Sequence, residues 1–215
     1  MIIMSKQKIK NIFRQVSLGR IIRNYRNSKD YRRWIQAGKP VPPPDSFKQT
    51  IIREYAKQYG ISVFIETGTY LGDMVNSVKD LFYEIYSIEL SAELYERAKK
   101  NFFKYKHISI LEGDSSKVLP QILNHVVEPC IFWLDGHWSG GITAKGEKET
   151  PIVAELKHVL GHSIKDHVIL IDDARCFTGQ NSYPTLPELR ELILGRYPNN
   201  IFEVRDDIIR THKKA

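Results

Sequence analysis

The sequence predicts an α/β fold, a doubly wound and mostly parallel sheet with helices on both faces and a C-terminal β-hairpin. Two observations lead to this fold class. β-rich runs alternate with amphipathic helical segments along the chain, and helices placed between strands connect parallel neighbours. The strand-like runs also end in acidic or glycine-containing turns, and such sheets bind ligands at the carboxyl ends of their strands.

Each expected element has its own signal. β-rich, largely apolar runs predict strands through Phe64, over 83–88, 107–111, 130–134 and 168–171. Amphipathic patterns predict helices over 47–59, 73–81, 91–103, 115–123 and 151–160. The helix after Ser91 has an N-cap residue, acids in its first turn and Lys99 and Lys100 near its end. Residues 201–205 and 208–212 are expected to pair as a hairpin across Asp206 and Asp207.

A glycine-containing turn follows the first strand, within residues 64–72. Glu66 stands at the strand tip, and Gly68 and Gly72 are spaced four apart. A dinucleotide-binding turn would have glycine where this chain has Tyr70, so a pyrophosphate has no obvious seat. The pattern favours S-adenosylmethionine (SAM), with Glu66 facing a cationic or amino group. A turn that needs glycine only for backbone reasons is the alternative.

Two further strand ends carry acids where a nucleoside would need them. Glu89 ends the second strand, about 20 residues after the glycine turn, where a carboxylate accepts both ribose hydroxyls. Asp114 follows the third strand, where it could hold an adenine amino group. Acids at buried strand tips cost desolvation free energy unless something satisfies them, so their recurrence favours a ligand.

On these residues the chain resembles the class I SAM-dependent methyltransferases, from about Ser46 to the C-terminus. The resemblance implies a Rossmann-like sheet of seven strands. It also implies a cofactor site made by Glu66, Thr67, Gly68, Thr69, Gly72, Glu89, Leu90, Asp114, Ser115 and Asp135.

The fourth and fifth strands end in the residues expected to perform chemistry. Asp135 and His137 follow the fourth strand, and Asp172 and Asp173 follow the fifth. Neighbouring carboxylates repel one another unless they share a cation, and oxygen ligands suit magnesium, calcium or manganese. We expect Mg²⁺ or another divalent cation at Asp135, Asp172 and Asp173. The alternative is that the Asp pair caps the next segment and Asp135 binds the amino end of the cofactor.

Such a metal site predicts methyl transfer to oxygen. Two substrate hydroxyls would chelate the ion, which lowers the pKa of the hydroxyl to be methylated. His137 would take up its proton, because an imidazole titrates near neutral pH. The expected catalytic residues are His137 and Asp135; a purely structural His137 is the alternative.

The pattern Asp135-x-His137 with Asp172 and Asp173 is similar to the metal-dependent sugar O-methyltransferases of the macrocin O-methyltransferase group. That resemblance implies an acceptor hydroxyl on a saccharide, or on a glycan or natural-product intermediate. Antibiotic-tailoring members are expected to have Asp as the base where this chain has His137.

Charged and aromatic residues in the loops leave two interpretations open. Arg175, Lys145, Lys148 and Tyr183 could bind an anionic sugar, a nucleotide-sugar phosphate or a lipid diphosphate, or they could be surface residues of the loops. Trp138 could stack on a sugar ring or fill the base of its loop.

Charge divides the chain of 215 residues into two parts. Residues 1–40 contain eleven Lys or Arg and one acid, a net charge of +10, although the whole chain carries only +7. We expect a basic helical extension with a Pro-rich connector over 1–44 and a methyltransferase domain over 45–215. A nucleic-acid partner is not expected, because the second part is slightly acidic.

The extension has an apolar stripe at helical spacing that includes Ile9, Ile12, Phe13 and Val16. It could bind anionic headgroups at the inner face of a membrane, or pack on its own domain or in a homo-oligomer, which we favour. Cys130 and Cys176 lack paired spacing, and apolar runs are too short to span a bilayer. We therefore expect a cytoplasmic protein.

Two other functions compete with methyl transfer. A SAM-binding protein without transferase activity would be expected to have lost Asp135, His137 and the Asp pair. A metal-dependent hydrolase or hydroxylase-like enzyme on the same fold would not need Glu66, Glu89 and Asp114. The presence of both sets of residues favours the methyltransferase.

Overall fold

The computed structural model describes residues 29–135 and 150–214, and in them it confirms the predicted fold. The sheet has the strand order β3-β2-β1-β4-β5-β7-β6. Its strands are β1 (Val63–Thr67), β2 (Glu84–Glu89), β3 (Ile108–Glu112), β4 (Cys130–Leu134), β5 (Val168–Ile171), β6 (Asn200–Arg205) and β7 (Ile208–Lys213). β1 to β5 run parallel, whereas β7 is antiparallel to both β5 and β6.

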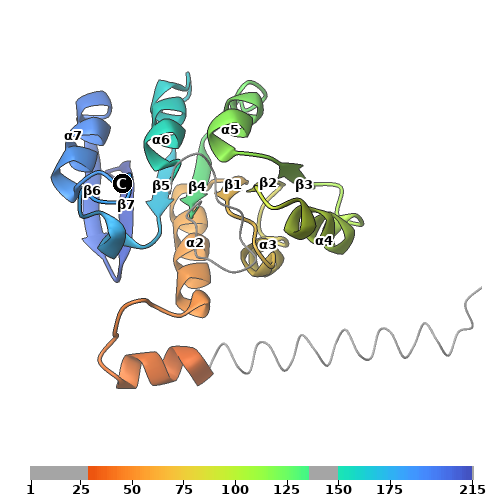
Figure 1. Cartoon of the computed structure of the whole chain (residues 1–215), viewed down its shortest axis with the longest axis horizontal. Helices are drawn as coiled ribbons and strands as arrows, with labels where there is room; N and C mark the ends of the chain where they lie inside the picture. Colours follow the sequence, from red (N-terminus) through yellow and green to blue (C-terminus); the bar gives the residue numbers. More distant parts are fainter. Residues whose placement is uncertain (1–28, 136–149, 215) are drawn as a thin grey trace, which may run out of the picture. The chain divides into compact units, whose positions relative to one another are not determined.

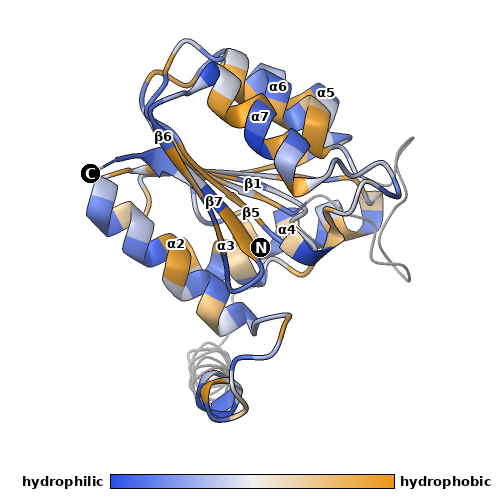
Figure 2. Cartoon of the chain, turned by 90° about the vertical axis from the view of Figure 1, so that its left-hand side faces the viewer, coloured by the Kyte–Doolittle hydropathy of each residue, from blue (hydrophilic) through white to orange (hydrophobic). Residues whose placement is uncertain are grey.

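Helices cover both faces of the sheet, as Figures 1 and 2 show from two directions. α5 (Ser115–Leu123), α6 (Ile152–Gly161) and α7 (Leu186–Arg196) lie on one face. α3 (Asp73–Val78), α4 (Ala92–Phe102) and the part of α2 (Asp45–Tyr59) that follows Thr50 lie on the other. Leu119, Leu156 and Ile193 come from α5, α6 and α7 and pack in one core with Phe132 of β4. Burial of these apolar faces is the main force that fixes the layers.

Element bounds agree closely with the sequence predictions. The strands at 130–134 and 168–171 and the helix at 115–123 have the predicted ends. α3 is shorter than predicted, because it ends at Val78 and the Leu81 N–H donates to the Val78 carbonyl in a separate turn. Ser91 is the N-cap of α4, but its side chain makes no capping hydrogen bond.

The sequence analysis did not predict α7. The helix begins with a capping box in which Thr185 accepts from the Glu188 N–H and the Glu188 carboxylate accepts from the Thr185 N–H. Leu189 and Ile193 then face the core. The Thr-x-x-Glu spacing was a readable signal for this start.

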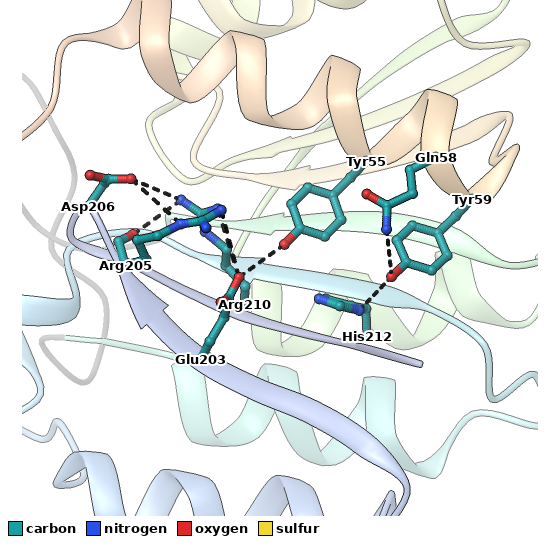
Figure 3. Close-up of polar contacts among 8 residues, drawn as sticks. All are labelled: Tyr55, Gln58, Tyr59, Glu203, Arg205, Asp206, Arg210 and His212. Carbon is teal, nitrogen blue, oxygen red and sulfur yellow. Dashed lines mark hydrogen bonds and ion pairs between the residues drawn. The ribbon is translucent and has the colours of Figure 1, made fainter. Parts of the chain in front are cut away.

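The predicted hairpin across Asp206 and Asp207 is confirmed, since Arg205 pairs with Ile208. Both turn residues have positive φ, at +52° and +62°, as a tight two-residue hairpin requires. Figure 3 shows how α2 contacts this hairpin. Arg210 of β7 is fully buried, and its Nη2 donates to the Arg205 carbonyl at 3.2 Å. Tyr59 of α2 contacts His212 of β7 at 2.6 Å.

The chain divides into two compact units, Met1–Thr50 and Ile51–Ala215, and each is described by itself. In the first, Trp34 packs on Phe47 with ring centroids 4.6 Å apart and donates to the Pro40 carbonyl at 2.7 Å. The apolar stripe of the extension lies outside the described residues, and the predicted boundary after residue 44 stays a prediction. Among the described helices, none combines the length and apolar character that crossing a bilayer requires.

A histidine pair joins the amino end of β5 to its neighbours. His167 Nδ1 accepts from the Cys130 N–H at 3.0 Å, so Nε2 must carry the proton that it shares with His162 Nδ1 at 2.9 Å. His162 Nε2 is then left to donate to the Leu123 carbonyl at 3.0 Å. The arrangement needs both rings neutral. Burial, with the neighbouring His162 and Lys165, lowers the pKa of His167 to about 4.

We expect His167 to make stability pH-dependent. Its pKa is lower in the folded than in the unfolded chain, so the unfolded state takes up the proton first and stability falls as the pH drops from about 6.5 to about 4. The advantage of wild type over His167→Asn in unfolding free energy should shrink by about 3 kcal/mol over this window. Denaturant unfolding at several pH values measures it. The exposed His125→Asn serves as the control, and a difference independent of pH for His167→Asn would contradict the assignment.

Candidate active site

The carboxyl ends of β1 to β5 lie along one edge of the sheet, because these strands are parallel (Figure 1). We call this the carboxyl edge. Thr67 at the end of β1 pairs with Ile88 on one side and Leu134 on the other. Every predicted site residue that the structure describes lies in a strand end or in the segment that follows one, up to Ser115, the first residue of α5. The edge therefore brings together residues that are up to about a hundred positions apart in sequence.

Main-chain hydrogen bonds build the turn after β1. The N–H groups of Gly68 and Thr69 donate to the Ile88 carbonyl at 2.9 and 3.2 Å. Gly68 and Gly72 both have positive φ, at +89° and +77°, which favours glycine. Gly72 has a second reason to be glycine, because a Cβ there would lie 2.8 Å from the Phe102 ring. Gly72 is thus needed to pack the turn against α4.

Glu89 joins this turn to the end of β2. Its Oε2 accepts from the Tyr70 N–H at 2.7 Å, and its Oε1 accepts from the Ser91 N–H at 2.9 Å. The main chain therefore fixes the orientation of a nearly buried carboxylate. Leu90 follows it with 37% of its surface exposed. An oriented acid beside an exposed apolar side chain can accept hydroxyl groups and contact a planar ring.

Glu66 lies beneath the turn and is itself buried. Its Oε2 accepts from the Ser87 hydroxyl at 2.5 Å, and Ser87 also contacts the Thr69 hydroxyl at 2.6 Å. Burial raises the pKa of Glu66 to about 8, while the Ser87 hydrogen bond opposes the rise and Asp135 and Glu89 add to it. In the described structure Glu66 thus supports the turn, and its predicted contact with a cofactor stays a prediction.

Asp114 and Ser115 stand where β3 passes into α5. Asp114 is the N-cap of α5, and its Oδ1 accepts from the N–H and the hydroxyl of Ser116 at 2.9 and 2.7 Å. Its Oδ2 lies 3.9 Å from Lys117 Nζ. Ser115 is buried in the first turn. The capping role explains the position of Asp114 by itself, and Oδ2 is the oxygen that the cap does not use.

Asp135, Asp172 and Asp173 form an acidic cluster at the ends of β4 and β5. One carboxylate oxygen from each lies within 4.8 Å of those of the other two. The Asp135 N–H donates to the Thr67 carbonyl at 3.2 Å, and the Asp172 N–H donates to the Leu134 carbonyl at 3.1 Å. These bonds continue the sheet to its edge and so hold the cluster. Its spacing and oxygen ligands fit the predicted divalent cation.

Arg175 contacts the cluster from η1, a short 3-10 helix after β5 (Ala174–Cys176). Its Nη1 donates to Asp173 Oδ1 at 2.6 Å and also to the Asp207 carboxylate, and its N–H donates to Asp207 Oδ1 at 2.8 Å. The hairpin turn thereby orients Asp173, whose backbone has a φ of +55°. Arg175 was predicted to contact an anionic substrate or solvent. In the structure Arg175 is exposed and pairs with two aspartates, and a contact with an anionic substrate stays a prediction.

The remaining predicted residues are only partly described. Tyr183 packs edge-on against Phe177 with ring centroids 5.2 Å apart, and burial raises the pKa of its hydroxyl. His137, Trp138, Lys145 and Lys148 lie outside the described residues, so their predicted roles stay predictions.

Sequence reasoning missed Glu155, an acid in the first turn of α6. Glu155 is buried, and its carboxylate lies near the hydroxyls of Ser115 and Thr67 and the carboxylates of Asp114 and Asp135. The available signal was its position: it follows Ile152 by three and precedes Val159 by four, so a helix places it on the apolar face. An acid on such a face is costly to bury unless a hydrogen bond or an opposite charge satisfies it.

No family model matches this sequence, and none of the curated proteins matches it. Solved structures do match its fold. An O-methyltransferase from Bacillus cereus in complex with SAH (S-adenosylhomocysteine) has a TM-score of 0.58 and 15% identity, over 87% of this chain and 90% of that chain. A second match is the O-methyltransferase TomG from Streptomyces achromogenes, which is involved in tomaymycin synthesis and was solved in complex with SAM. It has a TM-score of 0.59 and 14% identity, over 88% of this chain and 89% of that chain.

A third similar structure is the SAH-bound methyltransferase PaMTH1 of Podospora anserina. It has a TM-score of 0.53 and 14% identity, over 100% of this chain and 99% of that chain. Identities this low establish the fold alone. The chain therefore has the Rossmann-like fold of SAM-dependent methyltransferases.

Proposed function

We propose that this protein is a SAM-dependent O-methyltransferase, assisted by a divalent cation, that acts on a hydroxyl of a saccharide or of a glycan or natural-product intermediate. The proposal is carried by the way in which one edge of the sheet combines two sets of acids. The carboxyl edge presents the oriented carboxylate of Glu89 beside the glycine-containing turn, and the ends of β4 and β5 present three clustered carboxylates. The first suits a nucleoside and the second suits a hard cation.

In this proposal the first three strand ends bind the cofactor. Glu89 accepts the ribose hydroxyls, because its two oxygens are already held by the Tyr70 and Ser91 N–H groups and each keeps a free lone pair. Leu90 contacts the adenine ring through its exposed side chain. Asp114 Oδ2 faces the adenine amino group. Because the sequence identities to the solved structures are low, these assignments are argued from the residues of this site alone.

The acidic cluster would hold the cation through Asp135, Asp172 and Asp173. Their oxygens lie close enough to share one ion, and carboxylates are the ligands that Mg²⁺ prefers. The ion would supply Lewis acidity that favours ionisation of a substrate hydroxyl. Arg175 and Asp207 fix Asp173 within the cluster.

The transfer itself is a displacement at carbon. The acceptor oxygen attacks the methyl group of SAM, a C–O bond forms as the C–S bond breaks, and SAH leaves. The hydroxyl proton passes to a base, which we assign to His137 from its place two residues after Asp135. The protein contributes mainly by aligning oxygen and sulfonium, so the orientation of the strand ends supplies much of the rate.

The saccharide acceptor is the finer part of the proposal. It rests on the similarity of Asp135-x-His137, Asp172 and Asp173 to the macrocin O-methyltransferase group. The basic extension, with its net charge of +10 over residues 1–40, gives a further region for packing, self-association or contact with anionic lipid.

Calorimetric titration of SAM into wild-type protein, with chelator and with Mg²⁺, tests the proposal. We expect a dissociation constant in the micromolar range under both conditions. With Mg²⁺ and a panel of saccharides we expect SAH to form. No heat with SAM would overturn the cofactor assignment and favour a metal-dependent hydrolase if Mg²⁺ still binds. SAM binding without SAH formation on any acceptor would favour a binding protein.

A further inference from the structure

Glu155 is a buried acid whose carboxylate is not satisfied by the described structure. Only 1% of the residue is exposed, and neither Oε1 nor Oε2 has a hydrogen-bond partner among the described residues. An unsatisfied buried carboxylate costs several kcal/mol, so an apolar residue would be more stable at this position. A role in the site would explain why the position holds an acid.

Two hydroxyl groups surround this acid. Burial raises the pKa of Glu155 to about 7, the hydroxyls of Ser115 and Thr67 oppose the rise, and Asp114 and Asp135 add to it. The hydroxyls therefore lie close to the carboxylate, although neither has hydrogen-bonding geometry in the described structure.

Each hydroxyl belongs to a residue that shapes the carboxyl edge. Thr67 ends β1, and its Oγ1 accepts from the Asp135 N–H at 3.3 Å, which leaves its own proton to donate. Ser115 opens α5 next to Asp114. Glu155 from α6 thus lies near both the end of β1 and the start of α5.

We propose that Glu155 is a positioning residue of the cofactor site, which accepts hydrogen bonds from the Thr67 and Ser115 hydroxyls and so sets the spacing between β1, α5 and the end of β4. This inference rests on the proposed function and adds to it a residue that contacts neither cofactor nor acceptor. It acts through Thr67 on the backbone of Asp135, and through Ser115 on the turn that holds Asp114.

Glu155→Met tests the proposal, because it removes the carboxylate at similar side-chain length. SAH affinity, measured by calorimetry, should fall about fivefold, while the melting temperature of the ligand-free protein stays equal or rises. Glu155→Gln keeps an acceptor oxygen and should recover most of the affinity. Ser115→Ala alone should weaken SAH binding, and it should add little in the Glu155→Met background.

Thr211→Val is the matched control. Thr211 lies on β7, fully buried, and its hydroxyl also lacks a partner among the described residues, so the change removes the same kind of buried polar atom elsewhere. It should leave SAH affinity unchanged. Wild-type affinity in Glu155→Met, or additive effects with Ser115→Ala, would overturn the positioning role. If wild type itself fails to bind SAH, the proposed function falls and this inference with it.

Discussion

Asp172→Asn is expected to reduce kcat for methyl transfer by about a hundredfold or more, with SAM affinity near the wild-type value. Asparagine keeps an oxygen that can accept from the Asp173 N–H, as Asp172 Oδ1 does at 2.9 Å, so the local backbone should persist. An uncharged amide is nevertheless a poorer ligand for a hard dication. Release of SAH over a range of Mg²⁺ concentrations measures kcat and the cation requirement together.

Chelation should reproduce this loss in wild type, and added Mg²⁺ should reverse it. The matched control is Asp166→Asn, which changes an acid at the opposite end of β5. Asp166 pairs with Lys213 at 3.2 Å, and 57% of its side chain is exposed, so its replacement should leave kcat unchanged. Full activity of wild type in chelator would exclude the metal-assisted mechanism. It would not affect the proposed binding of SAM by the ends of β1, β2 and β3.

Glu89→Ala is expected to weaken SAM binding at least tenfold, a loss of about 1.4 kcal/mol or more, because the ribose loses its bidentate acceptor. The structure adds a second cause. Glu89 also accepts from the Tyr70 and Ser91 N–H groups at 2.7 and 2.9 Å. Alanine removes both hydrogen bonds, so the turn that should contact the cofactor loses the contacts that hold it in place. Calorimetry with SAM and with SAH measures the loss.

A conservative variant and a neighbouring acid separate the two causes. Glu89→Gln keeps one oxygen for the turn and should retain part of the affinity. Glu112 ends β3 directly opposite Glu89 in the register and is exposed, so Glu112→Ala should bind SAM like wild type. Unchanged affinity in a folded Glu89→Ala protein would remove Glu89 from the site. Its melting curve shows whether it is folded.

Local patterns were enough to predict most elements of the fold. The strands at 130–134 and 168–171 are continuous apolar runs, as strands buried on both faces should be. Alternation with helices then implied that they are parallel, and the edge that collects Glu89, Asp135 and Asp172 follows from that alone. α7 was missed although its capping box was readable, because the Pro-containing stretch before it resembles a loop.

The site was less predictable, because neighbours across the sheet decide what each acid does. Glu66 looked like a ligand contact, yet in the fold its carboxylate meets Ser87 from the adjacent strand. Arg175 is exposed, as a loop residue was expected to be, but the sequence did not show that the hairpin turn brings Asp207 against it. Gly72 was expected to be glycine for the turn itself, and in the fold the Phe102 ring also leaves no room for a Cβ there. None of these partners is near in sequence.

The sequence by itself determined the order of elements, the strand ends that carry acids and the separation of a basic extension from a slightly acidic body. These are properties of hydrophobic period and composition, which act over a few residues. Only the tertiary structure decided that Asp135, Asp172 and Asp173 converge within 4.8 Å and that Glu155 of α6 lies buried beside Thr67 and Ser115. The physical reason is that such distances depend on strand register and helix packing, which the whole core fixes together.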